Sequence, residues 1–286
     1  MRERIGVIGL GRMGSALAAR SSSQGYETCG WSRSGGCAET AAAGNYTLSE
    51  ALKEAVALSD ILMLSLLDGG AVEDILGQLA KLDLTSKLIV ETSTISPDIT
   101  RRNHAAITGA GGTLVDAPIS GGPEMVADGT MGLFIGGDDD AVERFMRIAP
   151  AFSNRIAHVG GLGAGAAAKI VNNIAIAGAF GSAIEAVSVG SKMGLDLRTM
   201  MGFLENSPGI TPMLKARIPM ILGDDDRVGF SMNSGAPAGE MFLDEASKLG
   251  VATPALEAQI ERAREAQAAG LGEKDYAAIF KFVLEK

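Results

Sequence analysis

Short apolar runs alternate with helix-compatible segments along the chain up to about residue 160. The apolar runs predict strands at 5–10, 28–31, 61–67, 88–91, 113–116, 133–136 and 155–159. Because continuous apolar strands that alternate with helices are typical of sheets covered on both faces, this pattern predicts a largely parallel α/β sheet. The turn residues Gly129-Thr130 also allow an antiparallel hairpin between Ala127 and Phe134, which would make the far half of the sheet mixed.

The pattern changes after the glycine-rich segment 160–163. Residues 164–193 are rich in Ala, Ile and Val, carry few charges and no Pro, and predict one long helix. A helix that is apolar on nearly all sides must be surrounded, so we expect it to form the spine of a second domain, which another subunit could share. The rest of the chain is helical in pattern, with breaks at 207–209, 223–226 and 270–272. We therefore expect a sheet domain over residues 1–162 and a helical domain over residues 163–286, joined by the long interdomain helix.

Charge and composition narrow the classes of function. The formal net charge of the 286 residues is −9, which leaves no basic surface for a phosphate backbone, so we expect neither nucleic acid nor a membrane as partner. The absence of an 18-residue uncharged apolar stretch and of a leader before the first strand disfavours membrane spanning and secretion. Cys29 and Cys37 match no disulfide framework, so a reduced, cytoplasmic protein is expected. The isolated His104 and His158 and the loop 224–226 predict no metal site.

A glycine pattern stands directly after the first predicted strand. The residues Gly9-Leu10-Gly11-Arg12-Met13-Gly14 follow the apolar run 5–8 and open a helix-compatible stretch. In a dinucleotide-binding turn the first glycine allows the tight bend, the second lets the backbone approach a pyrophosphate, and the third lets helix and strand pack closely. The six residues 9–14 are therefore predicted to bind a dinucleotide, together with Leu66 at the end of the strand 61–67. The first domain is expected to be of the Rossmann type.

The end of the second predicted strand bears on which dinucleotide is bound. An NAD site usually places an acidic residue there, to accept hydrogen bonds from the ribose 2′-hydroxyl. This chain has Ser32-Arg33-Ser34, and the planar guanidinium of Arg33 suits a 2′-phosphate. We therefore expect NADP (NADPH) at Ser32, Arg33 and Ser34, with NAD favoured less.

Lys169 lies among small and apolar residues near the start of the long predicted helix. Burial of an unpaired ammonium lowers its pKa, which makes Lys169 a candidate proton donor near neutral pH. Asn173 lies four residues later and Gly165 four residues earlier, so both share its helix face, and Gly165 is expected to leave room for a flat ring or a substrate.

The segment Asp116-Ala117-Pro118-Ile119-Ser120-Gly121-Gly122-Pro123 begins at a predicted strand end, on the sheet edge where open α/β folds bind ligands. Ser120 offers a hydroxyl, and Gly121 and Gly122 expose backbone N–H groups able to hold a carboxylate. A small anionic substrate would suit this segment, although the same residues could form an ordinary glycine-proline turn.

Three motifs occur in the order and spacing of the β-hydroxyacid dehydrogenase family, which the chain resembles over nearly its whole length. They are Gly9-x-Gly11-x-x-Gly14, Asp116-Ala-Pro-Ile-Ser120-Gly121-Gly122 and Gly163-x-Gly165-x-x-x-Lys169-x-x-x-Asn173. The resemblance implies that Ser120, Gly121 and Gly122 bind the substrate carboxylate. It also implies that Lys169 is the general acid/base and that Asn173 orients the substrate and the lysine. Thr94, within 91–97, matches a family position on the nicotinamide side of the cofactor.

The implied activity is NADP-dependent hydride transfer between nicotinamide and a small β-hydroxyacid or semialdehyde, or a 2-keto acid such as glyoxylate. The cofactor carries the hydride, and Lys169 as ammonium would protonate the alkoxide that forms. The family and the apolar helix together imply a homodimer or homotetramer.

One departure from the family pattern keeps other functions open. Family members usually carry a Lys-Asp pair early in a late helix, and alignment back from 249–254 places Pro237 and Ala238 at those positions. The substrate is then atypical or the activity on ordinary hydroxyacids is poor. The alternatives are an imine reductase of the same architecture and an NADP-binding protein without turnover. Retention of Lys169 counts against both.

Overall fold

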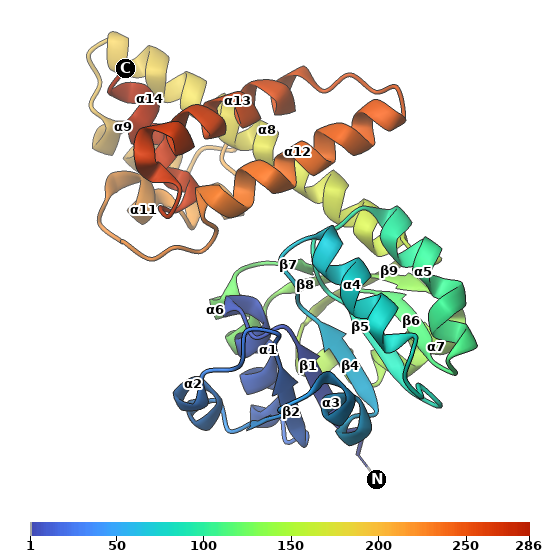
Figure 1. Ribbon diagram of the computed structural model, residues 1–286. Helices are drawn as coiled ribbons and strands as arrows, with labels where there is room; N and C mark the ends of the chain where they lie inside the picture. The colour runs from blue at the N-terminus through green and yellow to red at the C-terminus, as the bar shows by residue number, and fades with distance from the viewer. Residues whose placement is uncertain (1) are drawn as a thin grey trace. The chain divides into compact units, whose positions relative to one another are not determined.

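The computed structural model describes residues 2–286, and the chain divides into two compact units, Met1–Lys169 and Ile170–Lys286 (Figure 1). The division falls inside the long helix α8 (Ala164–Lys192), so the first turns of that helix belong to the N-terminal unit. The Rossmann-type sheet followed by helices confirms the predicted fold class.

The N-terminal unit is built on one nine-stranded sheet with the order β3-β2-β1-β4-β5-β6-β8-β7 and with β9 beside β8. Its strands are β1 (Ile5–Ile8), β2 (Thr28–Trp31), β3 (Thr47–Leu48), β4 (Ile61–Leu64), β5 (Leu88–Glu91), β6 (Thr113–Asp116), β7 (Ile119–Ser120), β8 (Gly132–Gly137) and β9 (Arg155–Gly160). The strands from β3 through β6 are parallel, as expected, and the sheet becomes mixed beyond them.

Five of the parallel strands end level with one another. Trp31, Ile8, Leu64, Glu91 and Asp116 are register neighbours across β2, β1, β4, β5 and β6. The loops that follow these residues therefore leave the sheet along one edge, which is the edge where open α/β sheets bind ligands. We call these five residues the end row.

Helices cover both faces of this sheet (Figure 1). Alternate strand residues point to opposite sides, as Val7 and Ile8 show by belonging to different buried clusters. On the Val7 side pack α1 (Arg12–Ser23), α6 (Pro123–Asp128) and α7 (Asp139–Met146), together with α2 (Ala38–Ala43) beyond β2. On the Ile8 side pack α3 (Leu52–Leu58), α4 (Gly69–Leu79) and α5 (Pro97–Gly109).

The mixed end of the sheet differs in detail from the expectation. β8 runs antiparallel to β6 and β7, which confirms a mixed far half. The predicted hairpin between Ala127 and Phe134 is wrong, because residues up to Asp128 form α6 and Gly129 ends that helix in the left-handed conformation, with φ of 72°. Pro123 at the first helical position favours the helix.

The second unit is all helical. Besides the rest of α8 it contains α9 (Leu197–Leu204), α10 (Pro212–Lys215), α11 (Ile218–Leu222), α12 (Met232–Lys248), α13 (Pro254–Ala266) and α14 (Ile279–Leu284). Phe180 of α8 lies at the centre of its core, with ring centroids 6.0 Å from those of both Tyr276 and Phe280. The predicted breaks coincide with turns, and Gly270 departs from helical geometry with φ of 89°.

α8 is less buried than its composition predicts. One side carries Phe180, Ile184 and Val187 into the core, whereas Val171 and Val189 are 69% and 58% exposed. Helices of this unit therefore cover one side of α8 only, and cover of its other side by another subunit stays a prediction. By length and hydropathy α8 alone, among the described helices, could cross a bilayer, a test that core helices of globular proteins also pass.

Candidate functional site

The glycine turn after β1 has the geometry that a dinucleotide-binding turn requires. Gly9 has φ of 99°, and a Cβ on it would lie 2.2 Å from the Ser65 carbonyl oxygen. A Cβ on Gly14 would lie 1.7 Å from the Gly9 carbonyl oxygen, so only glycine allows α1 to begin so close to the turn. A Cβ on Gly11 would meet nothing within 4 Å. The open space at Gly11, with the N-terminus of α1 beside it, fits a pyrophosphate.

The other residues of the turn lie at the same sheet edge. Arg12 and Met13 begin α1, and Met13 packs against the buried cluster beneath it. Leu10 packs over Gly30 of β2, where a Cβ would lie 2.8 Å from Leu10 Cδ2. Residues 9–14 therefore connect β1 to α1 and pack beside β2.

Leu66 and Thr94 follow the end row on neighbouring strands, β4 and β5. The Leu66 amide donates to Ser93 Oγ at 2.9 Å, and the Ser93 amide donates to Glu91 Oε1 at 2.8 Å. A Cβ on Gly9 would also come within 2.8 Å of Leu66 Cδ2, so Leu66 borders the glycine turn. Ser93 thus connects the two predicted cofactor residues, since it bonds to the Leu66 amide and directly precedes Thr94. The sequence did not indicate this role for Ser93, and its position next to Thr94 is the one signal that could have done so.

Ser32, Arg33 and Ser34 form the loop that follows β2. The Ser32 and Ser34 hydroxyls lie 3.3 Å apart. The Arg33 side chain is 81% exposed, and its Nη1 lies 3.9 Å from Oδ2 of the half-exposed Asp74. An exposed pair at that distance contributes little to stability, so the guanidinium is available for an anion.

Lys169 is buried, with 8% of the residue exposed, and its Nζ donates to the Ile119 carbonyl oxygen at 2.6 Å. Burial lowers the pKa of Lys169 to about 8, because the charged form is poorly solvated in a buried position. The sequence prediction of a buried, perturbed lysine agrees with this geometry. Its partner is a backbone carbonyl of the segment 116–123, which places that segment beside the lysine.

Ser120, Gly121 and Gly122 follow Ile119 directly. Ser120 ends β7 and is partly buried, and Gly121 has φ of 144°, a conformation that favours glycine. Gly122 precedes α6 and caps it without a side-chain hydrogen bond. Hence the lysine and the predicted carboxylate-binding residues occupy one part of the N-terminal unit.

Gly165 does not have the predicted role of leaving room for a ring or a substrate. A Cβ there would lie 2.3 Å from the Phe134 carbonyl oxygen and 2.7 Å from that of Asp116. Backbone from two strands fills the space, so Gly165 is needed for helix–sheet contact.

Asn173 belongs to the second unit, one turn after Lys169 along α8, and its Oδ1 accepts a hydrogen bond from Asn172 Nδ2 at 3.0 Å. Pro237 and Ala238 lie within α12. Pro237 is exposed and Ala238 packs beside Ile170 and Phe242, so neither supplies the charged pair usual in the family.

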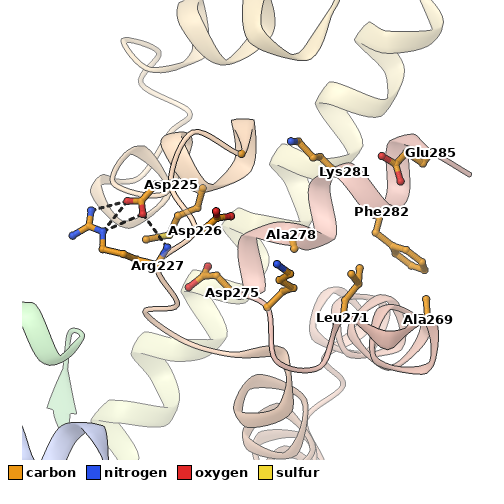
Figure 2. Close-up of a pocket in the computed structure, with 13 residues that line it drawn as sticks. Asp225, Asp226, Arg227, Ala269, Leu271, Asp275, Ala278, Lys281, Phe282 and Glu285 are labelled. Atoms are coloured by element: carbon orange, nitrogen blue, oxygen red, sulfur yellow. Dashed lines mark hydrogen bonds and ion pairs between the residues drawn. The ribbon is translucent and has the colours of Figure 1, made fainter.

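A separate cleft of about 470 Å³ lies within the helical unit, between the loop after α11 and α14 (Figure 2). Its walls carry side chains of both signs, among them Asp226, Lys281 and Glu285. Asp275 at its edge pairs with Arg217 at 3.2 Å and accepts hydrogen bonds from three backbone amides, so it stabilises the fold of the helical unit. None of the predicted site residues is among those described as lining this cleft.

Two family models match nearly the whole chain. The NAD binding domain of 6-phosphogluconate dehydrogenase matches residues 4–160, and the NAD-binding domain of NADP-dependent 3-hydroxyisobutyrate dehydrogenase matches residues 163–283.

Individual relatives agree with these models. The chain is 28% identical over 282 residues to 2-(hydroxymethyl)glutarate dehydrogenase from Eubacterium barkeri, which covers 97% of this chain and 94% of the relative. It is 31% identical to 2-hydroxy-3-oxopropionate reductase from Escherichia coli, over 68% of this chain and 67% of the relative. It is 30% identical to the NAD-dependent L-serine dehydrogenase from Pseudomonas aeruginosa, over 72% of this chain and 70% of the relative.

Solved structures share the fold. The 3-hydroxyisobutyrate dehydrogenase of Mycobacterium tuberculosis with L-serine has a TM-score of 0.87 and 26% identity, covering 99% of both chains. An imine reductase from Myxococcus stipitatus with NADP⁺ is more distant, with a TM-score of 0.67 and 23% identity over 98% and 99% of the chains. Together with the glycine turn, the level strand ends and the buried lysine, these matches establish that the chain belongs to the β-hydroxyacid dehydrogenase family of NAD(P)-binding oxidoreductases.

Proposed function

We propose that the protein is an NADP-dependent oxidoreductase that transfers hydride between nicotinamide and a small β-hydroxyacid or semialdehyde, with Lys169 as general acid/base. The observation that carries the proposal is the buried ammonium of Lys169, 2.6 Å from the Ile119 carbonyl oxygen and beside Ser120, Gly121 and Gly122. Besides the hydride, which a bound nicotinamide dinucleotide would supply, reduction of such a substrate requires a proton donor and groups that hold the carboxylate.

The residues of the chain have distinct roles in this proposal. Ser120 and the amides of Gly121 and Gly122 hold the substrate carboxylate. Lys169 donates a proton to the carbonyl oxygen as it becomes an alkoxide, and accepts the proton in the oxidative direction. Asn173, one helical turn on, orients the substrate and the lysine. A bound nicotinamide dinucleotide supplies or accepts the hydride.

Arg33 supports the preference for NADP over NAD. The end of β2 offers no carboxylate for a ribose 2′-hydroxyl at 32–34, and the exposed guanidinium suits a 2′-phosphate. The relatives include an NAD-dependent enzyme, so the preference rests on the residues of this loop.

The substrate class is small acids with a carbonyl at the β position, or short keto acids such as glyoxylate. Pro237 and Ala238 remove the family's second lysine, so we expect the accepted substrate to differ from those of ordinary family members. The ammonium of Lys169 and the segment 120–122 favour an aldehyde over a cyclic imine, which carries no carboxylate for that segment to hold.

We further propose a cytoplasmic homodimer or homotetramer. The support for self-association is the exposed side of α8, where Val171 and Val189 are 69% and 58% exposed. The acidic net charge of −9 supports a protein that binds neither nucleic acid nor an anionic membrane.

A substrate panel tests the proposed activity. NADPH oxidation is followed with glyoxylate, succinic semialdehyde, methylmalonate semialdehyde, tartronate semialdehyde and a cyclic imine. Turnover of at least one aldehyde acid is expected, with kcat falling on the order of 100-fold or more in Lys169→Ala while NADPH affinity is retained. Turnover of the imine alone, NADPH binding without turnover, or unchanged kcat in Lys169→Ala would each refute the proposal. The exposed Lys53→Ala is the matched control.

A further inference from the structure

Asp116, the last residue of β6, holds the first turn of α8 with both of its carboxylate oxygens. Its Oδ1 accepts the Gly163 amide at 2.7 Å, and its Oδ2 accepts the Ala166 amide at 2.6 Å. Amides in the first turn of a helix have no partner within the helix, so a carboxylate there satisfies them and also interacts favourably with the helix dipole. The strand end and the helix start are therefore joined by two short, charge-assisted hydrogen bonds.

Two glycines make this junction sterically possible. A Cβ on Gly165 would lie 2.8 Å from Asp116 Oδ2, and a Cβ on Gly136 would lie 2.7 Å from Asp116 Oδ1 and 2.7 Å from the Gly165 amide nitrogen. Gly136 is also the register partner of Asp116 on β8. The start of the helix thus packs directly against β6 and β8, with no space for a side chain.

The same segment of chain then binds the lysine. Ile119 follows Asp116 by three residues, and its carbonyl oxygen accepts Lys169 Nζ, while Lys169 follows Ala166 by three residues in α8. Asp116 holds the helix backbone at one end of this loop, and Ile119 holds the lysine side chain at the other. Two contacts therefore determine where the ammonium lies. Asp116 binds the backbone at the start of α8, and the Ile119 carbonyl oxygen binds the ammonium itself.

We propose that Asp116 is a positioning residue for Lys169: its carboxylate fixes the first turn of α8 to the end of β6 and so brings the ammonium to the Ile119 carbonyl beside Ser120. As a contribution to catalysis this inference rests on the function proposed above. Asp116 acts through the helix backbone and does not itself touch the substrate.

Burial is the largest effect and raises the pKa of the Asp116 carboxyl above its ordinary value. The amides of Gly163 and Ala166 and the nearby Arg101 act in the opposite direction and favour the ionised form, which can accept both amides. An asparagine has the same shape but a single acceptor oxygen, so Asp116→Asn removes one of the two anchors and the charge.

The test compares Asp116→Asn with Asp196→Asn. Asp196 is the matched control, since it caps α9 in the helical unit and both of its oxygens accept, from the amide and hydroxyl of Thr199. Three quantities are measured for each: kcat and KM, NADPH affinity, and the pKa of the Lys169 amine without substrate. The last is followed by NMR of labelled lysine side chains, with the Lys169 signal assigned from its loss in Lys169→Arg.

In Asp116→Asn we expect kcat to fall on the order of 100-fold, as for other misplaced catalytic groups, with NADPH affinity within about twofold of the wild type. The pKa of Lys169 should rise from about 8 toward its ordinary value as the ammonium leaves its buried position. Asp196→Asn should change neither. Unchanged kcat and unchanged Lys169 pKa in Asp116→Asn would overturn the positioning role.

A second pair of variants leaves the carboxylate in place. Gly165→Ala should displace the start of α8 from the sheet and so reproduce the effects of Asp116→Asn. Gly77→Ala in α4 is the control and should not have these effects, because a Cβ there meets nothing within 4 Å. Wild-type hydrogen exchange provides a test that needs no variant. The amides of Gly163, directly before α8, and of Ala166, in its first turn, should be protected although neither has a partner within the helix, and free exchange would overturn the inference.

Failure of the proposed function gives a different result. If the wild type turns over no substrate in the panel while Asp116→Asn still shifts the Lys169 pKa, the positioning of the ammonium stands and the proposed reaction falls. If the wild type is active and Asp116→Asn is indistinguishable from it, the reaction stands and the positioning falls.

Discussion

Glu91 and Asp116 are register partners at the ends of β5 and β6, and both of these acidic residues are buried. The two groups are bound differently. Asp116 has amide partners on both oxygens, whereas Glu91 uses Oε1 to accept the Ser93 amide and has no partner for Oε2. Burial, with a smaller contribution from Asp116, raises the pKa of Glu91 to about 7.

Glu91 should make the stability of the wild type depend on pH. Since its pKa is higher in the folded chain than in the unfolded one, the folded state binds more protons between about pH 4.5 and 7, and the free energy of unfolding falls as the pH rises through that range. Glu91→Gln removes this dependence, so its stability relative to the wild type should increase between pH 5 and 8 by on the order of 3 kcal/mol. Denaturant unfolding at several pH values measures the difference, and a constant difference would contradict the assignment.

The pH dependence of turnover should follow Lys169. With a pKa of about 8 in the unliganded chain, the ammonium proposed to donate the proton is present below pH 8, so kcat/KM for reduction should be level there and fall about tenfold per pH unit above it. For oxidation, which needs the neutral amine, kcat/KM should rise through the same pH. The profiles are measured at substrate concentrations well below KM, and a break that persists in Lys169→Ala would assign the titration to another group.

Arg33→Ala should weaken the binding of NADPH much more than the binding of NADH. Loss of a hydrogen bond to a charged 2′-phosphate weakens NADPH binding by about tenfold or more, while NADH, which lacks that group, should change less than about twofold. Arg147→Ala, whose partner is the exposed Glu143 at 2.9 Å on α7, is the control. Fluorescence titration of both reduced cofactors measures the effect, and equal weakening of the two would refute the 2′-phosphate contact.

Gly11 and Gly14 should respond differently to alanine. Gly11→Ala places a methyl group in open space, so the melting temperature should stay close to that of the wild type while NADPH affinity falls, on our expectation, by on the order of tenfold. Gly14→Ala forces α1 away from the Gly9 carbonyl oxygen and should lower stability by about 1–3 kcal/mol or more. Thermal unfolding without cofactor distinguishes them, and equal melting temperatures would contradict the assigned roles.

Val189→Asp should disrupt self-association. The variant places a charge on the exposed side of α8, and we expect its mass by light scattering to drop from a dimer or tetramer to a monomer with secondary structure retained. Val251→Asp, at a position 55% exposed between α12 and α13, is the comparison. A monomeric wild type would refute the proposed assembly.

Long patterned segments of the fold were predictable from sequence, and two-residue strands were not. β2, β5 and β6 have the predicted bounds, because each is a continuous apolar run that ends at a polar residue or a turn. β3 and β7 contain two residues each, too few for any periodicity. Within a single chain α8 is less buried than its composition predicts, because a mean over its whole length hides the difference between Phe180 and Val189.

At the candidate site, the sequence indicated residue types better than their contacts. A lysine among apolar neighbours implies burial, and Lys169 is buried. The role of Gly165 was misread, since the strands that fill its space are distant along the chain. Asp116 was noted as the start of a motif, but nothing local signals that its carboxylate reaches Gly163 across 47 residues of sequence.

The level ending of the five parallel strands bears on how this chain can be redesigned. On the proposed function, we expect exchange of the loop that begins after Trp31 to alter cofactor choice while the hydrogen-bond ladder beneath it is kept, whereas the segment after Asp116 must keep the Ile119 carbonyl that binds Lys169. An insertion of one residue inside β1, β4 or β5 would instead turn every later side chain of that strand to the opposite face. We therefore expect changes in the loop after β2 to be tolerated better than changes of strand length.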